Sequence, residues 1–422
     1  MSRANDGRTL RTRNAHTRNA HTRNAHTPIY STARLLLYSL PVALLLGCSP
    51  SRPETSTVID KARFDALVPQ LLRDHNSAGV GIGVIRDGKL VWTGYYGEQA
   101  PGVPASARTV FNTASVAKTV TAETILSLAA KGLINLDEPI AAYVKHPDLK
   151  DDPRYGLLTP RLLLSHRSGL LNWSYEYKDG RLAFVRDPGT QFGYSGAGVD
   201  LAAQYAEEKV GQDFETLASA HLLGSLGAKE ISMGRLQPWL DGRLAVPMNA
   251  KGEYRPLGEL NARFAENAVG TWSAADDLLT TVDAYATFLT GVIRSDWLTT
   301  AQAAERSTII TSLNGDPIWT CDAGPEVRCA DAYGHGIGWM VYRYGDHTVL
   351  KHGGNDAGEN ALVYYSPDTK NGAVIFVNGG NGIFVTVRVL ELIGDEPHVA
   401  AYYRQLVKKH YGVAMAPLGD SD

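Results

Sequence analysis

A lysine follows a serine by three positions in 111-FNTASVAKTVTA-122, where most other side chains are small or apolar. Such a run is expected to pack into a protein interior, where an unpaired ammonium group is costly. If a helix begins near Ala114, residues three apart share one face, so the Lys118 amine can reach the Ser115 hydroxyl. A partly desolvated amine with a lowered pKa can then accept the serine proton and make the hydroxyl nucleophilic. The alternative is a helical lysine whose charged end reaches the surface.

The composition is that of a soluble globular protein. The chain has 422 residues, of which 44% are hydrophobic and 20% charged, with a formal net charge of −3. This length allows a large core, in one big domain or two intergrown ones. The near-neutral charge gives no electrostatic argument for nucleic acid. Because we find no metal-ligand spacing, phosphate-binding glycine loop or dinucleotide fingerprint, we expect no metal and no cofactor.

The first 33 residues are expected to be a disordered leader. The pentapeptide TRNAH occurs three times within residues 12–27, and it contains nothing that could form a core. Metal binding by the three repeat histidines is the alternative, at His16, His21 and His26. A further hypothesis is that the repeat is upstream sequence translated from a misplaced start codon.

An export signal is predicted at residues 34–48, RLLLYSLPVALLLGC, because a basic flank precedes a short apolar core. Its last four residues resemble the bacterial lipobox, whose cysteine, here Cys48, is lipidated and becomes the mature N-terminus. By the lipobox rules, Ser49 after the cysteine directs the lipoprotein to the outer membrane. We therefore expect a periplasmic protein on a lipid anchor, with residues 49–57 as a polar tether. The alternatives are an ordinary cleaved signal and a single anchor helix.

Two cysteines remain, Cys321 and Cys329, in a short Gly- and Pro-containing segment. In an exported protein this pair predicts a structural disulfide. A metal site is disfavoured because no second pair of ligands with matching spacing lies nearby.

The remaining chain, residues 58–410, is predicted to be one α/β (α+β) domain. Strand patterns occur near both ends: a hairpin around Asp87-Gly88 at 80–97, and strands at 336–344, 360–367 and 372–378. Helical patterns occur at 59–73, 119–132, 274–289, 384–393 and 399–408. We expect an antiparallel β-sheet built from the N- and C-terminal segments and flanked by helices. A mostly helical lobe, at about 116–290, is inserted, and a cleft between the lobes is the expected site.

Several segments, in order between residues 60 and 380, resemble those of the serine β-lactamases and penicillin-binding DD-peptidases. The resemblance is to the class C-like branch, which includes related esterases. It rests on 111-FNTASVAKTVTA-122, 131-KGLINLDEPIAAYV-144, 162-LLLSHRSGL-170, 188-PGTQFGYSGAG-198, 270-GTWSAADDLLT-280 and 351-KHGGNDAGE-359.

The resemblance implies that Ser115 is the nucleophile, with Lys118 and Tyr194 as the base. In this family the tyrosine also shuttles protons to the leaving group, which requires a nearby cation such as Lys118. His166 is interpreted as structural. Asp276 and Asp277 are interpreted as helix-start residues rather than an acid pair.

The strand segment can be aligned in two registers, on Lys351 or on His352. We choose His352, Gly353 and Gly354, because a glycine then falls six residues after the basic residue, as is common in the family. His352 would bind an anionic substrate group or join a proton network with Tyr194, and the glycines would let the substrate lie along the strand edge. The backbone N–H groups of Ser115 and Asn355 would form the oxyanion hole.

One position departs from the family pattern: Gly196 stands where an asparagine usually follows the tyrosine by two residues. Its carboxamide ordinarily helps to hold the lysine and to bind the substrate amide. Its loss removes about 1–3 kcal/mol of polar contact unless another group replaces it. Efficient hydrolysis of penicillins and cephalosporins is therefore in doubt.

These features predict an exported serine hydrolase that forms an acyl-enzyme on Ser115. Its substrates would be small molecules or peptides, with amide bonds of β-lactams or D-amino-acid peptides ranked first. A carboxylesterase of the same fold is the alternative. A second alternative is a non-catalytic, penicillin-sensing or penicillin-binding lipoprotein.

Overall fold

The structure is a computed structural model that describes residues 59–419, except 234–236, 256–272, 317 and 326. The leader, the signal segment with Cys48 and the tether all lie outside these described residues. The motif segment 270–272 does so too. Among the helices of the described residues, none is both long and apolar enough to cross a bilayer.

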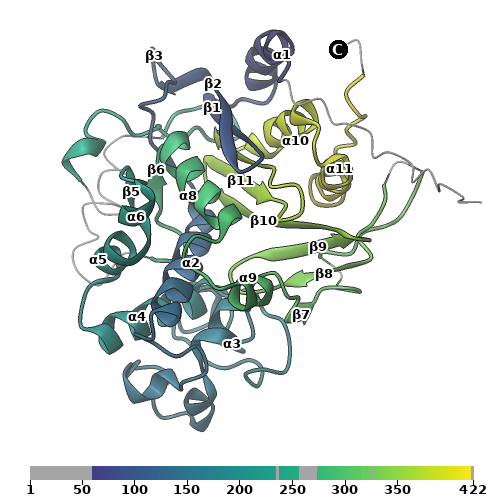
Figure 1. Cartoon of the computed structure of the whole chain (residues 1–422). Coiled ribbons are helices and arrows are strands. Elements are labelled where there is room, and N and C mark those ends of the chain that lie inside the picture. The colour runs from purple at the N-terminus through teal and green to yellow at the C-terminus, as the bar shows by residue number, and fades with distance from the viewer. Residues whose placement is uncertain (1–58, 234–236, 256–272, 317, 326, 420–422) are drawn as a thin grey trace, which may run out of the picture. The chain divides into compact units, whose positions relative to one another are not determined.

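The described residues form a nine-stranded antiparallel sheet in the order β3-β2-β1-β12-β11-β10-β9-β8-β7 (Figure 1). The N-terminal strands pair directly with the C-terminal ones, since Gly79 of β1 lies opposite Asn378 of β12. This confirms the predicted sheet built from both ends of the chain. The strands are β1 (Gly79–Arg86), β2 (Lys89–Ala100), β3 (Val103–Pro104), β7 (Thr311–Ser312), β8 (Ala332–His335), β9 (Met340–Tyr344), β10 (His347–Asp356), β11 (Glu359–Tyr365) and β12 (Gly372–Asn378).

The turn between β1 and β2 is the predicted two-residue hairpin. Asp87 has a φ of 49° and Gly88 a φ of 70°. Two consecutive positive φ angles define the turn type that matches the twist of a β-hairpin, and Asp-Gly is a favoured sequence for it.

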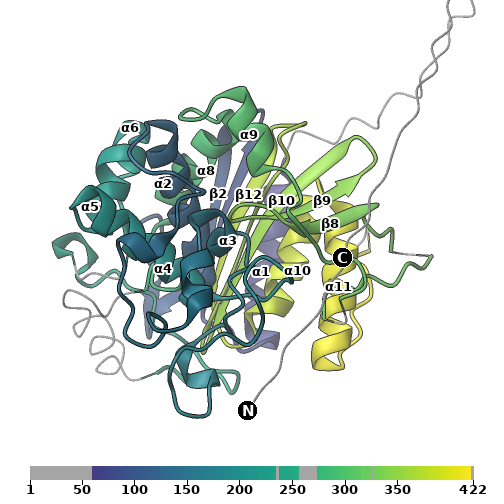
Figure 2. The same cartoon turned by 90° about the horizontal axis from the view of Figure 1, so that it is seen from below.

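Helices cover both faces of the sheet (Figure 2). One face packs against α1 (Lys61–Asp74), α10 (Gly382–Ile393) and α11 (Pro397–Tyr411). The other packs against α8 (Val282–Arg294) and lies toward α2 (Ala117–Ala130). Close packing of α8 requires a glycine in β1, because a Cβ at Gly81 would lie 2.6 Å from Val282.

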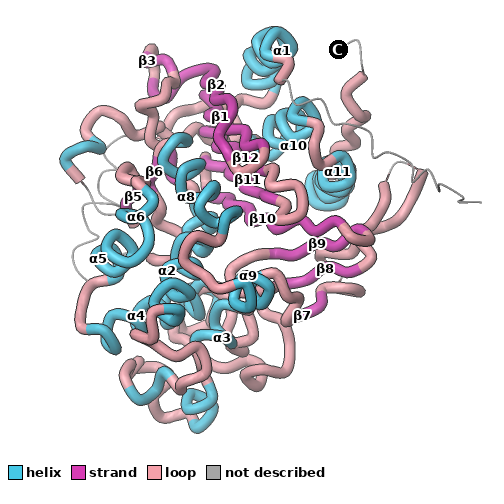
Figure 3. The backbone as a smooth tube through the Cα atoms, in the orientation of Figure 1, coloured by secondary structure: helices cyan, strands magenta, loops and turns pink. Residues whose placement is uncertain are grey.

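The inserted lobe combines helices with long loops, as Figure 3 shows. A small sheet in the order β4-β6-β5 joins its ends. Loops make up more of this lobe than the prediction of a mostly helical lobe implies. Its helices are α2, α3 (Pro160–Leu164), α4 (Gly196–Val210), α5 (Phe214–Ala218), α6 (Gly224–Leu226) and α8, and its strands are β4 (Phe111–Asn112), β5 (Ile231–Ser232) and β6 (Leu279–Thr280).

The predicted helix at 274–289 is wrong in its first half. Residues 274–276 form a turn, and β6 follows, pairing with both β4 and β5. The helix begins only after Thr281, whose side chain accepts a hydrogen bond from the Ala284 backbone. Pairing with two strands therefore overrides the helical pattern of 274–280.

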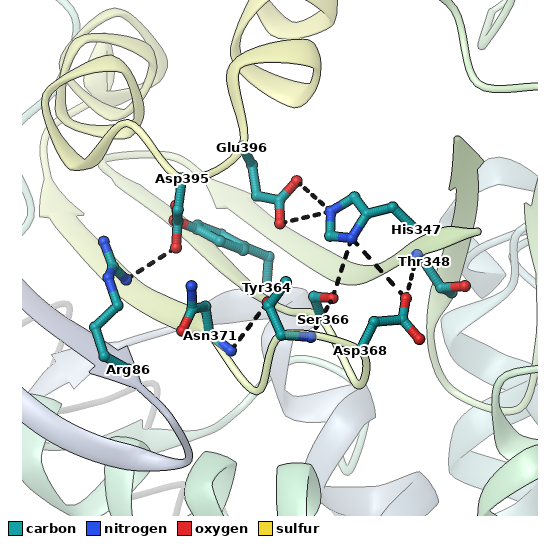
Figure 4. Close-up of polar contacts among 10 residues, drawn as sticks. Arg86, His347, Thr348, Tyr364, Ser366, Asp368, Asn371, Asp395 and Glu396 are labelled. Carbon is teal, nitrogen blue, oxygen red and sulfur yellow. Dashed lines mark hydrogen bonds and ion pairs between the residues drawn. The ribbon is translucent and has the colours of Figure 1, made fainter. Parts of the chain in front are cut away.

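A polar network fixes the start of β10 to the linker between α10 and α11 (Figure 4). His347, the first residue of β10, lies 3.0 Å from the Glu396 carboxylate. The preceding residue of the linker, Asp395, accepts hydrogen bonds from Tyr364 of β11 and, at 2.9 Å, from Arg86 of β1. The network joins three strands to these helices, and β10 is the strand that carries His352.

Candidate active site

Ser115 lies in a 3-10 turn, η1 (Ala114–Val116), immediately before α2. Ala114 has a φ of 46°, a left-handed conformation that is strained for a residue with a side chain. The Asn112 carboxamide accepts a hydrogen bond from the Ala114 backbone at 3.1 Å, which holds this conformation. The turn brings Ser115 to the wall of a cavity of about 400 Å³.

Lys118 is buried, at 1% exposure, in the first turn of α2. Its Nζ donates to Ser115 Oγ at 2.9 Å and to the Ala275 carbonyl at 2.8 Å. The expected contact between the amine and the hydroxyl is therefore present, and the lysine does not extend to the surface.

Asp276 contacts the Ser115 side chain, although we had interpreted it as a helix-start residue. Ser115 Oγ donates to Asp276 Oδ1 at 3.3 Å. That interpretation is wrong for Asp276 and Asp277, because both lie before β6 and no helix starts there. Sequence reasoning missed this contact because an acidic pair before an apolar run is also typical of a helix N-terminus.

Asp200 of α4 holds the segment that carries Asp276. Its carboxylate accepts hydrogen bonds from Ser273 Oγ at 3.0 Å and from the Ala275 backbone at 3.1 Å. Burial raises the pKa of Asp200 to about 7. Because the Ala275 carbonyl binds Lys118, Asp200 positions two neighbours of the nucleophile. Nothing in the sequence around Asp200 indicated this role.

Tyr194 is held in place by His166. The backbone of Gly193 donates to the His166 carbonyl at 2.9 Å, and that of Ser195 donates to His166 Nδ1 at 3.1 Å. The two rings lie 4.3 Å apart. Burial, followed by the interactions with His335 and Lys118, keeps the pKa of His166 well below its usual range, so the ring is neutral. The structural interpretation of His166 becomes more specific: it fixes the turn on both sides of Tyr194.

Tyr194 and His352 both line the cavity that Ser115 reaches. Lys118 Nζ lies 5.0 Å from the centre of the Tyr194 ring, and the Tyr194 and His352 rings are 6.3 Å apart. The structure therefore brings Ser115, Tyr194 and His352 around one cavity, with Lys118 in contact with Ser115.

His352, which lines this cavity, has a buried hydrogen-bond acceptor. Its Nδ1 lies 2.8 Å from the Gly353 carbonyl, which can only accept, so Nδ1 carries the proton. Burial, followed by the charge of Lys118, keeps the pKa of His352 well below its usual range. Within the described residues, Nε2 has no hydrogen-bond partner. A neutral ring with a free lone pair favours the proton-network role over binding of an anionic group.

The strand that carries His352 passes directly against the Ser115 turn. A Cβ at Gly354 would lie 2.1 Å from the Thr113 carbonyl and 3.3 Å from the Ser115 backbone nitrogen, so only glycine fits. Asn355 follows, and its side chain accepts a hydrogen bond from Asn360 at 3.3 Å. Gly353 has more room, since its nearest contact would be 3.7 Å away.

At Gly196, where the family usually has asparagine, the Trp173 indole fills the space of a side chain. A Cβ at position 196 would lie 2.3 Å from the Trp173 indole, and this indole lies 5.4 Å from Lys118 Nζ. The Gly196 backbone donates to the Asn172 carboxamide at 2.7 Å, and Asn172 lines the cavity. An indole and a carboxamide from a distant loop therefore occupy the surroundings of the lysine.

Cys321 and Cys329 form a disulfide, with Cα atoms 5.7 Å apart. The adjacent Trp319 lines the cavity, and its carbonyl accepts a hydrogen bond from Tyr402 of α11 at 2.9 Å. Across the residues that the structure describes, no cluster of acidic, histidine or cysteine side chains is suited to a metal ion.

The relatives found by comparison with known proteins include an esterase and a beta-lactamase. Esterase EstB from Burkholderia gladioli is 28% identical over 276 residues, which cover 53% of this chain and 69% of the esterase. A beta-lactamase from Pseudomonas fluorescens is 28% identical over 178 residues, 39% of this chain and 48% of that protein. The chain thus spans about half the length of the second relative.

Solved structures with the same fold include penicillin-binding and D-peptidase proteins. The octameric penicillin-binding protein homologue of Pyrococcus abyssi superposes with a TM-score of 0.63 at 19% identity, over 83% of this chain and 82% of that one. The D-alanine carboxypeptidase AmpC of Burkholderia cenocepacia superposes with a TM-score of 0.61 at 19% identity, over 79% and 99%.

The Beta-lactamase family model matches residues 64–395. Since this range covers most of the chain and contains Ser115, Lys118, Tyr194 and His352, the protein belongs to the Beta-lactamase family of serine hydrolases.

Proposed function

We propose that this protein is an exported serine hydrolase that forms an acyl-enzyme on Ser115. The observation that carries the proposal is the 2.9 Å contact between Lys118 Nζ and Ser115 Oγ inside a buried site. A buried amine in this position can accept the hydroxyl proton as Oγ attacks a carbonyl carbon.

The neighbouring groups suit the later steps. The backbone N–H groups of Ser115 and Asn355 would stabilise the oxyanion. Tyr194 would return the proton to the leaving group, and His352 Nε2 would accept a hydrogen bond from the phenol. Water would then hydrolyse the acyl-enzyme, with Lys118 and Tyr194 again removing a proton.

The site favours esters as acyl donors. Trp173 takes the space of the family's asparagine side chain, which ordinarily binds the amide of a β-lactam or peptide. Asp276, 3.3 Å from Ser115 Oγ, disfavours a carboxylate close to the scissile bond. Such a carboxylate is present in penicillins and in peptides that end in D-alanine. The esterase relative supports this order.

A D-amino-acid peptidase is the second candidate, and the edge of β10 favours it. Strand β9 pairs with β10 only as far as the Met340–Lys351 pair, so no described strand pairs with residues 352–356 on that side. An extended peptide could add to this edge through main-chain hydrogen bonds.

Labelling and turnover separate these functions. Mass spectrometry with a fluorophosphonate should show an adduct on Ser115 that Ser115→Ala abolishes. Turnover of p-nitrophenyl acetate without turnover of nitrocefin or D-Ala-D-Ala peptides would support the esterase. A stable penicillin adduct without turnover would support a sensor, and the absence of any adduct would overturn the enzymatic proposal.

The lipid-anchored periplasmic location is supported by the signal-like residues 34–48, which end at Cys48. The Cys321–Cys329 disulfide suits an oxidising compartment. Labelling with a palmitate analogue should mark the protein at the outer membrane, and Cys48→Ser should remove the label. Persistence of the label in that variant would contradict the lipoprotein assignment.

A further inference from the structure

The cavity at Ser115 continues through the sheet to its opposite face. Beyond the Met340–Lys351 pair, no strand of the described residues pairs with β10 on the β9 side, which leaves an opening. Side chains alternate along a strand, so His352 and Lys351 point to opposite faces. Both nevertheless line the same cavity, together with Ser115 on one face and Tyr403 on the other.

The part of the cavity beyond β10 is here called the rear compartment. Its wall is largely apolar, and its polar groups include the Lys351 amine, the Tyr403 phenol and the side chains of Asn360, Thr386 and His410. Gly353 lies at the opening, where even a Cβ would be 3.7 Å from the Ala361 carbonyl and 3.9 Å from Tyr403 Oη. The rear compartment is lined by Trp319, Lys351, Asn360, Leu362, Ile383, Thr386, Tyr403, Leu406, Val407, His410 and Tyr411.

Lys351 is a buried amine that the proposed reaction does not use. It is 2% exposed, and its Nζ donates to Tyr403 Oη at 2.9 Å. The amine also lies 4.6 Å from the Tyr403 ring and 5.0 Å from the Tyr342 ring. Throughout the described part of the chain, no carboxylate forms an ion pair with Lys351. Burial lowers the pKa of Lys351 to about 7.

A buried ammonium is normally paired with an anion. A carboxylate brought by a ligand would supply the missing partner, and the Tyr403 hydroxyl would be a second donor for it. The same carboxylate would be disfavoured near Ser115, where the Asp276 carboxylate contacts the serine hydroxyl and His352 Nε2 is a buried acceptor. The anionic end of a substrate therefore belongs in the rear compartment, separated from the scissile bond by an apolar stem.

We propose that the rear compartment binds the apolar tail of an acyl donor whose far end is a carboxylate held by Lys351 and Tyr403. The preferred substrates are then monoesters of medium-chain dicarboxylic acids. The inference deepens the proposed acyl transfer at Ser115 and rests on it for turnover.

A matched pair of substrates tests the proposal. The 4-nitrophenyl monoester of suberic acid carries the carboxylate, and its methyl ester lacks the charge. The wild-type kcat/KM should be about tenfold higher for the acid, which corresponds to about 1.4 kcal/mol. Lys351→Met should abolish this preference, and Tyr403→Phe should reduce it. Lys408→Met, on the exposed side of α11, should retain it.

A binding measurement keeps this test independent of turnover. By calorimetry, octanoate should bind the wild-type protein and Ser115→Ala about tenfold more tightly than octanamide does. Lys351→Met, or Tyr403→Phe if the first variant does not fold, should reduce the difference. Equal binding of the two probes to the wild type would overturn the rear-compartment proposal.

The two proposals can fail separately. Turnover of 4-nitrophenyl acetate with no preference for a carboxylate would overturn the rear compartment alone. Tight, Lys351-dependent octanoate binding without turnover of any ester would support the compartment and overturn the acyl-transfer function.

Discussion

The Trp173 indole occupies the space into which a side chain at Gly196 would project. A Cβ at this position would lie 2.3 Å from the ring, well inside van der Waals contact. The indole also lies 5.4 Å from Lys118 Nζ. The pair Gly196 and Trp173 is therefore one structural unit, in which the glycine makes room for the tryptophan beside the lysine.

Gly196→Asn alone should consequently not restore the family's asparagine contact. Overpacking against Trp173 should lower the free energy of unfolding by about 1–3 kcal/mol, measured by urea unfolding. Nitrocefin turnover should not rise above the wild-type rate. An increase in this single variant would contradict the steric account.

The double variant Trp173→Ala/Gly196→Asn distinguishes the steric effect of the indole from the chemical effect of the carboxamide. With the indole removed, the new carboxamide has room near Lys118. Its nitrocefin turnover should exceed that of Trp173→Ala, which is the matched control. Equal rates in the two variants would mean that the carboxamide does not limit β-lactam hydrolysis here.

Asp276→Asn should lower the kcat for 4-nitrophenyl acetate by about 10- to 100-fold. Its carboxylate accepts the Ser115 hydroxyl at 3.3 Å, and its charge would stabilise Lys118 once the lysine has taken a proton. Asp277→Asn is the control, because Asp277 accepts the Ser273 backbone N–H, whereas the Ser115 hydroxyl donates to Asp276. Similar losses of kcat in both variants, at equal stability, would argue against a direct role for Asp276.

The nucleophile pair was predictable because its geometry is local. Residues three apart at a helix start share a face, so Ser115 and Lys118 had to be neighbours once that helix formed. The sheet was equally predictable, since β-rich runs around turn residues occur at both ends of the chain. Alternation along β10 also placed Lys351 on the face opposite His352, as the chosen register required.

The rest depends on contacts between distant segments. No local signal links Trp173 to Gly196, or Asp200 to Ala275, because each pair meets only through packing of the inserted lobe. Asp276 was misinterpreted because β6 gains hydrogen bonds from two strands, which a local helical pattern cannot reveal. The opening beside β10 depends on where β9 stops pairing, and the predicted strand at 336–344 did not show that end point.

Acid should destabilise the protein below about pH 6.5, because His166, His335 and His352 are buried and neutral. Burial lowers the pKa of His335 to about 3 and keeps the pKa of the other two well below the usual value. The unfolded chain therefore binds more protons than the folded protein. The contribution of these histidines to the free energy of unfolding is fully present above the unfolded pKa of about 6.5. As the pH drops below this value, the contribution falls by about 1.4 kcal/mol per pH unit for each histidine.

His335→Gln tests this assignment without altering Ser115, Lys118 or Tyr194. Urea unfolding at pH 7, 6 and 5 should show a shallower loss of stability in the variant, by about 1.4 kcal/mol per pH unit. His410→Gln, at an exposed position, is the control and should follow the wild type. Parallel pH curves for all three proteins would show that His335 does not titrate on unfolding.

Loss of a buried ion pair between α2 and α9 should lower the free energy of unfolding more than loss of an exposed ion pair. Glu123 of α2 is fully buried, and it accepts hydrogen bonds from Arg306 at 3.3 Å and from the Trp339 indole at 2.9 Å. Arg306 lies in α9 (Thr300–Arg306) and is 2% exposed. Arg306→Met leaves the Glu123 charge uncompensated, so the free energy of unfolding should fall by about 3–5 kcal/mol.

The exposed pair Arg294–Asp296 provides the matched control for this loss. These side chains are 49% and 36% exposed, so Asp296→Asn should cost less than about 1 kcal/mol. In Arg306→Met/Glu123→Met the unpaired charge is also removed, and most of the lost stability should return. If the double variant were as unstable as Arg306→Met, the loss would arise from packing around α2 and not from the isolated carboxylate.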